Sequence, residues 1–165
     1  TEFLYSLPDV FDEQFPNRAN AFQFDTDTHN IFICADSNRL LSAFLELLSN
    51  AAEADNSCGS IQIHSHVNAC GHTVTVSVTG KGSLSEINPS EMQTNPLIDA
   101  DAPLTAQLST PFFSTKENHA GLGLSIVAQV CHTHHAGFEL YSRNGFTTAG
   151  ITFPILAMDD MRNTI

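Results

Sequence analysis

The chain has 165 residues, of which 18 are acidic and 6 basic, so its formal net charge is -12 at pH 7. This length is typical of one domain whose core is large enough to fold by itself. Such an acidic surface repels phosphate backbones and anionic lipid headgroups, which argues against nucleic acid and membrane surfaces as partners. We therefore expect residues 1–165 to form a single domain with no nucleic acid and no direct membrane contact.

The cysteines and the apolar segments indicate a cytoplasmic protein, either complete or cut from a larger one. The four cysteines form no CxxC pair, and most lie in or beside apolar segments, where a free cysteine behaves as a small hydrophobic residue. No apolar run approaches the roughly 20 residues that span a bilayer, and the N-terminus lacks the pattern of a signal peptide. We expect reduced, structural thiols.

The N-terminal part of the chain predicts one short helix and a hairpin. Pro8 and Pro16 act as breakers and leave room for a helix at about residues 9–14. Two short β-rich runs follow, at 21–24 (AFQF) and 30–35 (NIFICA). A polar stretch separates them, so we expect the two runs to pair as a hairpin.

A helix and a strand pair are predicted next. Residues 37–54 (SNRLLSAFLELLSNAAEA) have apolar residues at helical spacing, with Asp36 or Ser37 as the N-cap. The alternating runs at 61–67 and 72–79 are separated by a turn-like NACG segment. They predict two antiparallel strands.

The C-terminal half predicts a loop, a helix and a hairpin. Residues 83–111 are rich in proline and polar residues without a period, which indicates a lid-like loop or an insertion. An amphipathic helix is expected at about 122–134, followed by strands at 138–142 and 150–156 with an Asn144-Gly145 turn signal. Strand pairs around two long helices, without βαβ alternation, predict an α+β two-layer sandwich: a mixed, mostly antiparallel sheet with helices on one face.

The helix at 37–54 carries a polar stripe formed by Glu46, Asn50 and Glu53, which are spaced i, i+4, i+7. An ordinary solvated helix face is one interpretation. The other is a metal site, because asparagine is a mediocre helix former and its amide oxygen is a hard ligand suited to Mg²⁺.

The segment STKENHAGLGLS places Gly121 and Gly123 at the beginning of a predicted helix. Glycine allows close backbone approach, and the free N–H groups of a helix N-terminus favour a phosphate. Lys116 adds a positive charge in front of them. A plain helix-entry turn explains the glycines about as well, so neither this segment nor the polar stripe decides the function alone.

The order of the segments resembles the ATP-binding catalytic domain of sensor histidine kinases, in the superfamily that includes gyrase, mismatch-repair ATPases and a heat-shock chaperone. The resemblance covers about residues 31–156. ADSNRLLSAFLELLSNAAEA is similar to the family's Asn box, and VSVTGKGSL stands at the place of its first glycine box. TPFFSTK resembles the Phe-rich box, AGLGLSIV the second glycine box, and AGITF the last short motif.

The resemblance implies ATP and Mg²⁺ as cofactors and gives individual residues a role. Asn50 matches the asparagine that holds Mg²⁺ against the nucleotide phosphates, and Lys116 matches the lysine of the Phe-rich box. Glu46 stands where many histidine kinases have another asparagine, and it is similar to the water-activating glutamate of gyrase-like ATPases. The turn that closes over the phosphates is matched by Gly121, Leu122, Gly123 and Leu124, with Ser125 at the start of the following helix.

The first glycine box departs from the family pattern. When Gly80 and Gly82 are aligned with the Asp-x-Gly-x-Gly motif, Val78 takes the place of the aspartate that accepts a hydrogen bond from the adenine amino group. Valine has no acceptor, and the loss corresponds to ~1 to 3 kcal/mol. A pseudo-kinase domain with weak or no nucleotide binding, acting as a regulatory or docking module, is therefore the alternative function. A gyrase-type ATPase fits FFSTK and GLGLSIV less well.

The resemblance also implies partners. In this family the phospho-accepting histidine lies on a separate helical hairpin, and none of the eight histidines here has the corresponding neighbours. The fragment alone is therefore not expected to autophosphorylate. The implied partners are a histidine-bearing dimerisation domain of the same protein, which makes the parent a homodimer, and the receiver domain of a response regulator. The implied location is cytoplasmic, and the chain can then be the cytosolic part of a membrane-bound sensor.

The histidines near residue 134 have two interpretations. One interpretation is a metal site formed by these histidines together with Cys131. The other is that they are ordinary histidines at a helix C-terminus, where the helix dipole favours them. His135-Ala136-Gly137 resembles the family's His-Gly-Gly helix end, which favours the second interpretation.

Overall fold

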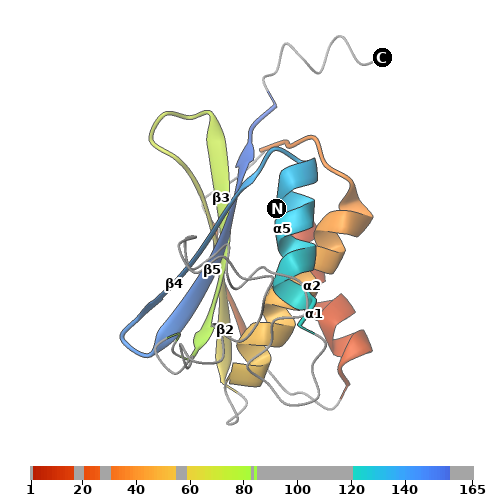
Figure 1. Ribbon diagram of the computed structural model, residues 1–165, viewed down its shortest axis with the longest axis vertical. Coiled ribbons are helices and arrows are strands. Elements are labelled where there is room, and N and C mark those ends of the chain that lie inside the picture. Colours follow the sequence, from red (N-terminus) through yellow and green to blue (C-terminus); the bar gives the residue numbers. More distant parts are fainter. Residues whose placement is uncertain are drawn as a thin grey trace, which may run out of the picture.

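The computed structural model describes residues 2–16, 21–26, 31–54, 59–82, 84 and 121–156. In this part of the chain the helices lie together on one face of a sheet (Figure 1). None of these helices is long and apolar enough to cross a lipid bilayer. The elements are α1 (Glu2–Gln14), β1 (Ala21–Thr26), α2 (Ser37–Ala54), β2 (Ser60–Val67), β3 (Thr73–Lys81), α5 (Gly123–Thr133), β4 (Gly137–Arg143) and β5 (Phe146–Pro154).

The sheet has the strand order β1-β2-β3-β5-β4. The β1–β2 pair is parallel, and the other three pairs are antiparallel. A mixed, mostly antiparallel sheet with helices on one face confirms the predicted α+β two-layer sandwich. The predicted β2–β3 pair and the predicted C-terminal hairpin are confirmed as well. The hairpin turn uses Asn144 (φ 54°) and Gly145 (φ 79°), the left-handed pair that a two-residue hairpin requires.

Helix α2 forms where its apolar period and its cap predict it. Asp36 is the N-cap: its Oδ1 accepts hydrogen bonds from the backbone N–H groups of Asn38 (3.0 Å) and Arg39 (3.1 Å). The apolar side of the helix faces the core and contains seven buried residues. The packing and the N-cap therefore both favour a helix over this segment. These residues are Leu40, Ala43, Phe44, Leu45, Leu47, Leu48 and Ala52.

The two faces of the sheet differ in chemistry. On the helix-covered face, β2 contributes Ile61 and Ile63 to the core. On the other face, hydroxyl groups pair across β3 and β5: Thr75 with Thr152 (2.8 Å) and Thr79 with Thr148 (2.8 Å). Thr75 is buried, so this pairing satisfies a hydroxyl group that solvent hardly reaches.

The predicted hairpin between 21–24 and 30–35 is wrong. β1 pairs in parallel with β2, with Phe22 opposite Ile61, and residues 31–36 form no strand. The reason is non-local, because both phenylalanines of β1 pack against α1. The ring centroid of Phe22 lies 5.7 Å from that of Phe11, and the ring centroid of Phe24 lies 4.7 Å from that of Tyr5. Such packing outweighs the short-range preference for a hairpin.

Helix α1 is longer than the short helix predicted at 9–14, because it continues through Pro8. A proline inside a helix costs about 3 kcal/mol. Burial of a large apolar side chain contributes roughly 1.5 to 3 kcal/mol, and three such side chains of α1 are buried, so packing exceeds that penalty. They are Leu4, Leu7 and Phe11.

Helix α5 is one residue shorter at each end than the helix predicted at about 122–134. His134 is the C-cap, and His135 adopts the left-handed conformation (φ 52°) that glycine usually provides. The backbone N–H of Ala136 donates to the Cys131 carbonyl (2.8 Å), and that of His135 donates to the His132 carbonyl (3.3 Å). These two bonds form a Schellman motif, which closes the helix without a glycine.

The cysteines do not all behave as the sequence predicts. Cys34, Cys70 and Cys131 are free thiols, but only Cys131 is buried. Burial raises the pKa of the Cys131 thiol to about 11, which keeps it protonated and unreactive near neutral pH. Cys34 and Cys70 are exposed, and Cys58 lies outside the described residues, as does nearly all of the predicted loop at 83–111.

Candidate functional site

The first residue of α5 packs directly on the polar stripe of α2. A Cβ atom added to Gly123 would lie 2.6 Å from Oε2 of Glu46 and 3.6 Å from Nδ2 of Asn50. Only glycine therefore lets the backbone approach the stripe without displacing a side chain. The structure thus brings together the asparagine-bearing helix and the glycine turn, which are far apart in the sequence.

The N-terminus of α5 lacks a side-chain cap. Leu122 is its N-cap residue and makes no side-chain hydrogen bond to the helix, and no acidic residue lies in the first turn. Ser125 does not fill this role, because its hydroxyl donates to the Leu122 carbonyl (2.7 Å). Gly121 turns the chain into the helix with a left-handed φ of 65°. An uncapped helix N-terminus of this kind favours a bound anion such as a phosphate.

The polar stripe of α2 is half-buried and negatively charged. Burial, and to a smaller extent the charge of Glu53, raise the pKa of the Glu46 carboxyl above its usual value. Oε1 of Glu53 accepts a hydrogen bond from the Ser49 hydroxyl (3.0 Å). Carboxylate and amide oxygens are hard ligands of the kind that Mg²⁺ prefers, and a divalent cation would also offset the repulsion between the stripe and a phosphate.

Gly80 in β3 and Gly82 just after it allow the end of this strand to pack closely against α2. A Cβ on Gly80 would lie 2.7 Å from Cβ of Ala51, and one on Gly82 would lie 2.9 Å from Cβ of Ala54. The Gly82 carbonyl accepts a hydrogen bond from the Thr147 hydroxyl (3.1 Å). This close contact explains both glycines by packing, whether or not a ligand is bound.

Val78 lies on the same face of β3 as Gly80, two residues earlier in the strand. Its side chain is 2% exposed, and its neighbours in the sheet register are Ile63 and Ala149. The position at which the family pattern expects aspartate is thus an apolar part of the helix–sheet core. It provides no hydrogen-bond acceptor from its side chain.

The predicted site residues therefore fall into two neighbouring groups along α2. Glu46 and Asn50 meet the α5 turn, whereas Gly80 and Gly82 meet the last turns of the helix. Lys116 lies outside the described residues. The sequence did not single out Ala51 and Ala54, although two alanines three residues apart, opposite a GxG pair, are a signal for a close helix–strand contact.

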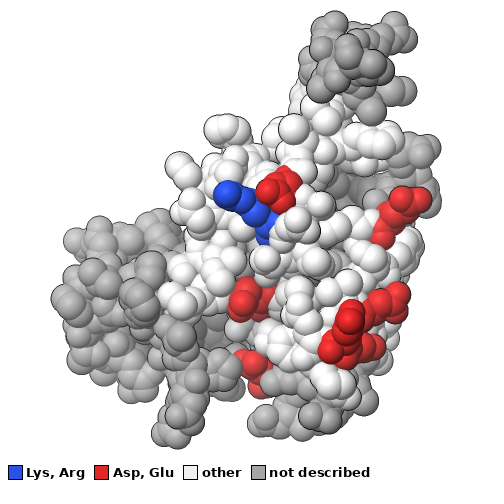
Figure 2. Space-filling view, turned by 90° about the vertical axis from the view of Figure 1, so that its right-hand side faces the viewer, with Lys and Arg blue, Asp and Glu red and all other residues white. Residues whose placement is uncertain are grey.

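Figure 2 shows several acidic side chains on the side of the molecule where the helices lie.

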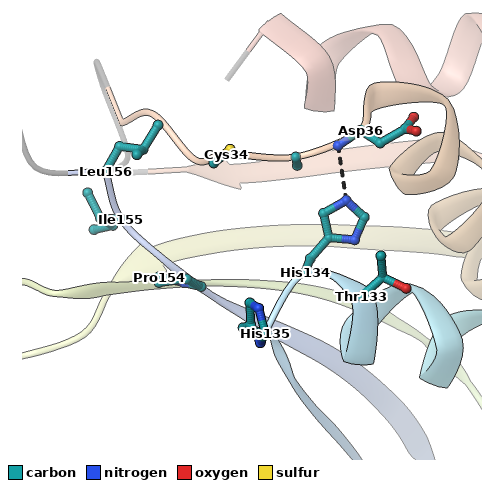
Figure 3. A pocket seen from close by; sticks show the side chains of 9 residues that line it. Cys34, Asp36, Thr133, His134, His135, Pro154, Ile155 and Leu156 are labelled. Atoms are coloured by element: carbon teal, nitrogen blue, oxygen red, sulfur yellow. Dashed lines mark hydrogen bonds between the residues drawn. The ribbon is translucent and has the colours of Figure 1, made fainter. Parts of the chain in front are cut away.

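A separate cavity of about 400 Å³ lies at the other end of α5. Figure 3 shows His134 at its wall, with Nε2 accepting a hydrogen bond from the backbone N–H of Asp36 (3.0 Å). Among the described residues, no three His, Cys, Asp or Glu side chains are placed to hold a metal ion, so the cluster imagined around Cys131 is not assembled here. The lining residues are Cys34, Ala35, Asp36, Thr133, His134, His135, Pro154, Ile155 and Leu156.

Comparison with known proteins assigns the family. The family model for histidine kinase-, DNA gyrase B- and HSP90-like ATPases matches residues 35–157, so the chain belongs to this family. The curated relatives include the sensory histidine kinase/phosphatase NtrB of Rhizobium leguminosarum bv. phaseoli, which is 33% identical over 127 residues, or 74% of this chain and 32% of that protein. NtrB of Rhodobacter capsulatus is 28% identical over 73% of this chain and 33% of that protein. The chain thus spans about one third of the length of these relatives.

Solved structures place the chain among histidine kinase catalytic domains. The nucleotide-free catalytic domain of histidine kinase ThkA has a TM-score of 0.69 and 25% identity, covering 93% of this chain and 90% of that one. ThkA has also been solved in complex with the response regulator protein TrrA, with a TM-score of 0.67, 25% identity, and coverage of 94% and 40%. The mycobacterial sensor histidine kinase MprB shares the fold, with a TM-score of 0.66, 21% identity, and coverage of 94% and 97%.

Proposed function

We propose that residues 1–165 form one catalytic domain that binds Mg²⁺-ATP and donates the γ-phosphoryl group to a histidine on a separate domain, for relay to a response regulator. The observation that carries this proposal is the contact of Gly123 with Glu46 and Asn50. It joins the polar stripe of α2, which carries carboxylate and amide groups, to an uncapped helix N-terminus. Phosphoryl transfer depends mainly on such positioning and on charge stabilisation.

In this proposal each residue has a distinct role at the nucleotide. Asn50 holds Mg²⁺, which binds the phosphates in turn. The turn from Gly121 to Leu124 closes over the phosphates, whose oxygens accept hydrogen bonds from the first backbone N–H groups of α5, including that of Ser125. Lys116 adds a positive charge at the phosphates, and Gly80 and Gly82 form the floor next to the adenine.

Glu46 is proposed as the general base. Its carboxylate lies against the first residue of α5, next to the phosphates in this arrangement. Burial raises the pKa of the Glu46 carboxyl, and a raised pKa makes a carboxylate a better proton acceptor near neutral pH. In this role Glu46 orients the attacking nitrogen of the phospho-accepting histidine, or a water molecule when hydrolysis replaces transfer.

The partners of the parent protein are also part of the proposal. We infer a histidine-bearing dimerisation domain in the same cytoplasmic polypeptide, a homodimeric parent, and a receiver domain as the phosphoryl acceptor. The solved complex of ThkA with its response regulator supports the last of these. The short span of this chain relative to NtrB leaves room for the first.

A second candidate function rests on Val78. Because its buried side chain offers no acceptor for the adenine amino group, nucleotide binding is weakened, and a regulatory pseudo-kinase domain is the alternative. The curated relatives are kinases, so they do not favour this alternative over the main proposal.

Titration of the chain with ATP and Mg²⁺ by calorimetry tests the proposal. We expect micromolar binding that requires Mg²⁺ and disappears in Asn50→Ala. Asn38→Ala is the matched control, because Asn38 is an exposed asparagine at the other end of α2. Circular dichroism verifies that both variants are folded. Absence of heat at millimolar ATP in the folded wild-type chain would overturn the kinase proposal and support the pseudo-kinase alternative.

A further inference from the structure

Two histidines lie side by side on the sheet face that the helices leave uncovered. His64 and His66 are two residues apart on β2, whose alternate residues Ile61 and Ile63 are buried under the helices. The two imidazole rings therefore point to the opposite side of the sheet. Their centroids are 5.2 Å apart, and their planes differ by 31°.

An aspartate on the neighbouring strand fixes the orientation of the first ring. Asp25 of β1 is opposite His64 in the parallel register, and its Oδ2 lies 3.2 Å from Nδ1 of His64. A carboxylate can only accept, so Nδ1 carries a proton, and in the neutral ring the lone pair is then on Nε2. A carboxylate behind an imidazole is the usual support of a metal-binding histidine, because it sets the tautomer and raises the basicity of the ligating nitrogen.

The second ring has an unsatisfied nitrogen. Nδ1 of His66 is buried and has no hydrogen-bond partner within the described part of the chain. An unpaired buried polar atom of this kind is unfavourable, and native structures usually satisfy it with water or an ion. The pair thus combines an oriented lone pair on His64 with an unpartnered nitrogen on His66.

We propose that His64 and His66 together bind one divalent transition-metal ion, of which Zn²⁺ is the natural probe. Imidazole nitrogens suit Zn²⁺, Cu²⁺ and Ni²⁺ far better than Mg²⁺, so this site takes a different class of ion from the nucleotide site. Asp25 supports His64 from behind. The described residues place no third His, Cys, Asp or Glu as a ligand, so water completes the coordination and the ion exchanges readily.

The surroundings of the pair agree with a cation site that is independent of the nucleotide. The chain carries a net charge of -12, which attracts cations to its surface. The side chain of His64 is 42% exposed and that of Asp25 88%, so an ion can reach the first ring from solvent. Helices α2 and α5, which contain Glu46, Asn50 and Gly123, lie on the other side of the sheet (Figure 1).

Zn²⁺ titration followed by NMR of the histidine side chains, in reducing buffer, tests this proposal on the chain. We expect the signals of His64 and His66 to shift together at the lowest Zn²⁺ concentrations, and not with Mg²⁺. His64→Ala and His66→Ala should each weaken binding about tenfold or more, because a single imidazole loses the chelate. Asp25→Asn should weaken it severalfold by removing the support of His64.

His72→Ala and His132→Ala are the matched controls, because both remove an exposed histidine outside this pair. They should leave the first Zn²⁺ site unchanged. The backbone amide spectrum of each variant verifies the fold. Equal Zn²⁺ affinity in the wild type and in the His64→Ala/His66→Ala double variant would overturn the proposal. So would first shifts at other histidines, or an absence of binding below millimolar Zn²⁺.

Discussion

The imidazole of His134 joins the end of α5 to the beginning of α2. Its Nε2 accepts a hydrogen bond from the backbone N–H of Asp36 at 3.0 Å, and its Nδ1 donates to the Val130 carbonyl at 2.8 Å. The carboxylate of the same Asp36 caps α2. One side chain therefore connects two helices that the sequence separates widely (Figure 3).

His134→Ala should lower the free energy of unfolding by about 1 to 3 kcal/mol, because it removes both hydrogen bonds and leaves the Asp36 N–H without its partner. Urea denaturation measures the difference. His132→Ala is the control, since His132 is exposed in the same last turn of α5, and we expect a change within about 0.5 kcal/mol. Equal effects of the two substitutions would show that the ring of His134 does not stabilise the helix junction.

Gly80→Ala should destabilise the domain by about 1 to 3 kcal/mol, because the new methyl group would meet the backbone and side chain of Ala51 at 2.7 to 3.2 Å. Gly137→Ala is the control: its new Cβ would have only an ordinary contact, 3.8 Å from Thr152. Thermal unfolding of both variants provides the test. If Gly80→Ala is as stable as Gly137→Ala, then the close packing of β3 on α2 does not require glycine.

Glu46→Gln should stabilise the domain at neutral pH by at most about 0.5 kcal/mol, because Glu46 is partly exposed and solvent screens its charge. Burial and Glu53 raise the pKa of the Glu46 carboxyl above its unfolded value of 4.5, so the folded state binds the proton more tightly. The contribution of Glu46 to stability is therefore fully present below that value, and it is lost as the pH rises through the folded pKa.

The gain from Glu46→Gln should accordingly shrink as the pH is lowered toward 4.5. Urea denaturation across this range measures it. Glu13→Gln, on the exposed side of α1, controls for the removal of one negative charge. A gain that is constant with pH would contradict the assigned direction of the pKa shift.

Val78→Asp should strengthen ATP binding by about tenfold to a hundredfold, because the carboxylate would accept the adenine amino group that valine leaves unpaired. Without nucleotide the variant should be less stable, since Val78 is 2% exposed and a carboxylate there loses its solvation. Calorimetric ATP titration and thermal unfolding measure the two effects.

Val76→Asp is the matched control for this substitution, because Val76 is buried on the same face of the same strand. It should lower stability without increasing ATP affinity. An equal ATP affinity of the Val78→Asp variant and the wild-type chain would remove Val78 as the explanation of weak adenine recognition.

Local patterns predicted the elements whose signals are contained in a few neighbouring residues. The period and the Asp36 cap gave α2 its bounds, and alternation predicted the β2–β3 pair. The Asn144-Gly145 signal predicted the last hairpin, although β5 begins at Phe146, earlier than expected. These features rest on interactions within one turn or between adjacent strands, which sequence spacing expresses directly.

The sequence predicted the first strand but not the strand with which it pairs. Residues 21–24 carry the same alternation whether they pair with a neighbour in the chain or with β2, and only contacts with α1 favour the parallel arrangement. The length of α1 depends on the same contacts, since Pro8 argues against a helix locally. Parallel pairing is non-local by nature, because it needs a long crossover connection.

The sequence by itself determined the residue types of the candidate site: the polar stripe with Asn50, the glycine turn before α5, and Val78 where an acceptor is expected. Only the tertiary structure decided that Gly123 touches Glu46, that Gly80 packs on Ala51, and that His134 holds Asp36. Each of these contacts joins segments from distant parts of the chain. They form only when α2 and α5 are packed on the same face of the sheet, and that packing depends on the whole core.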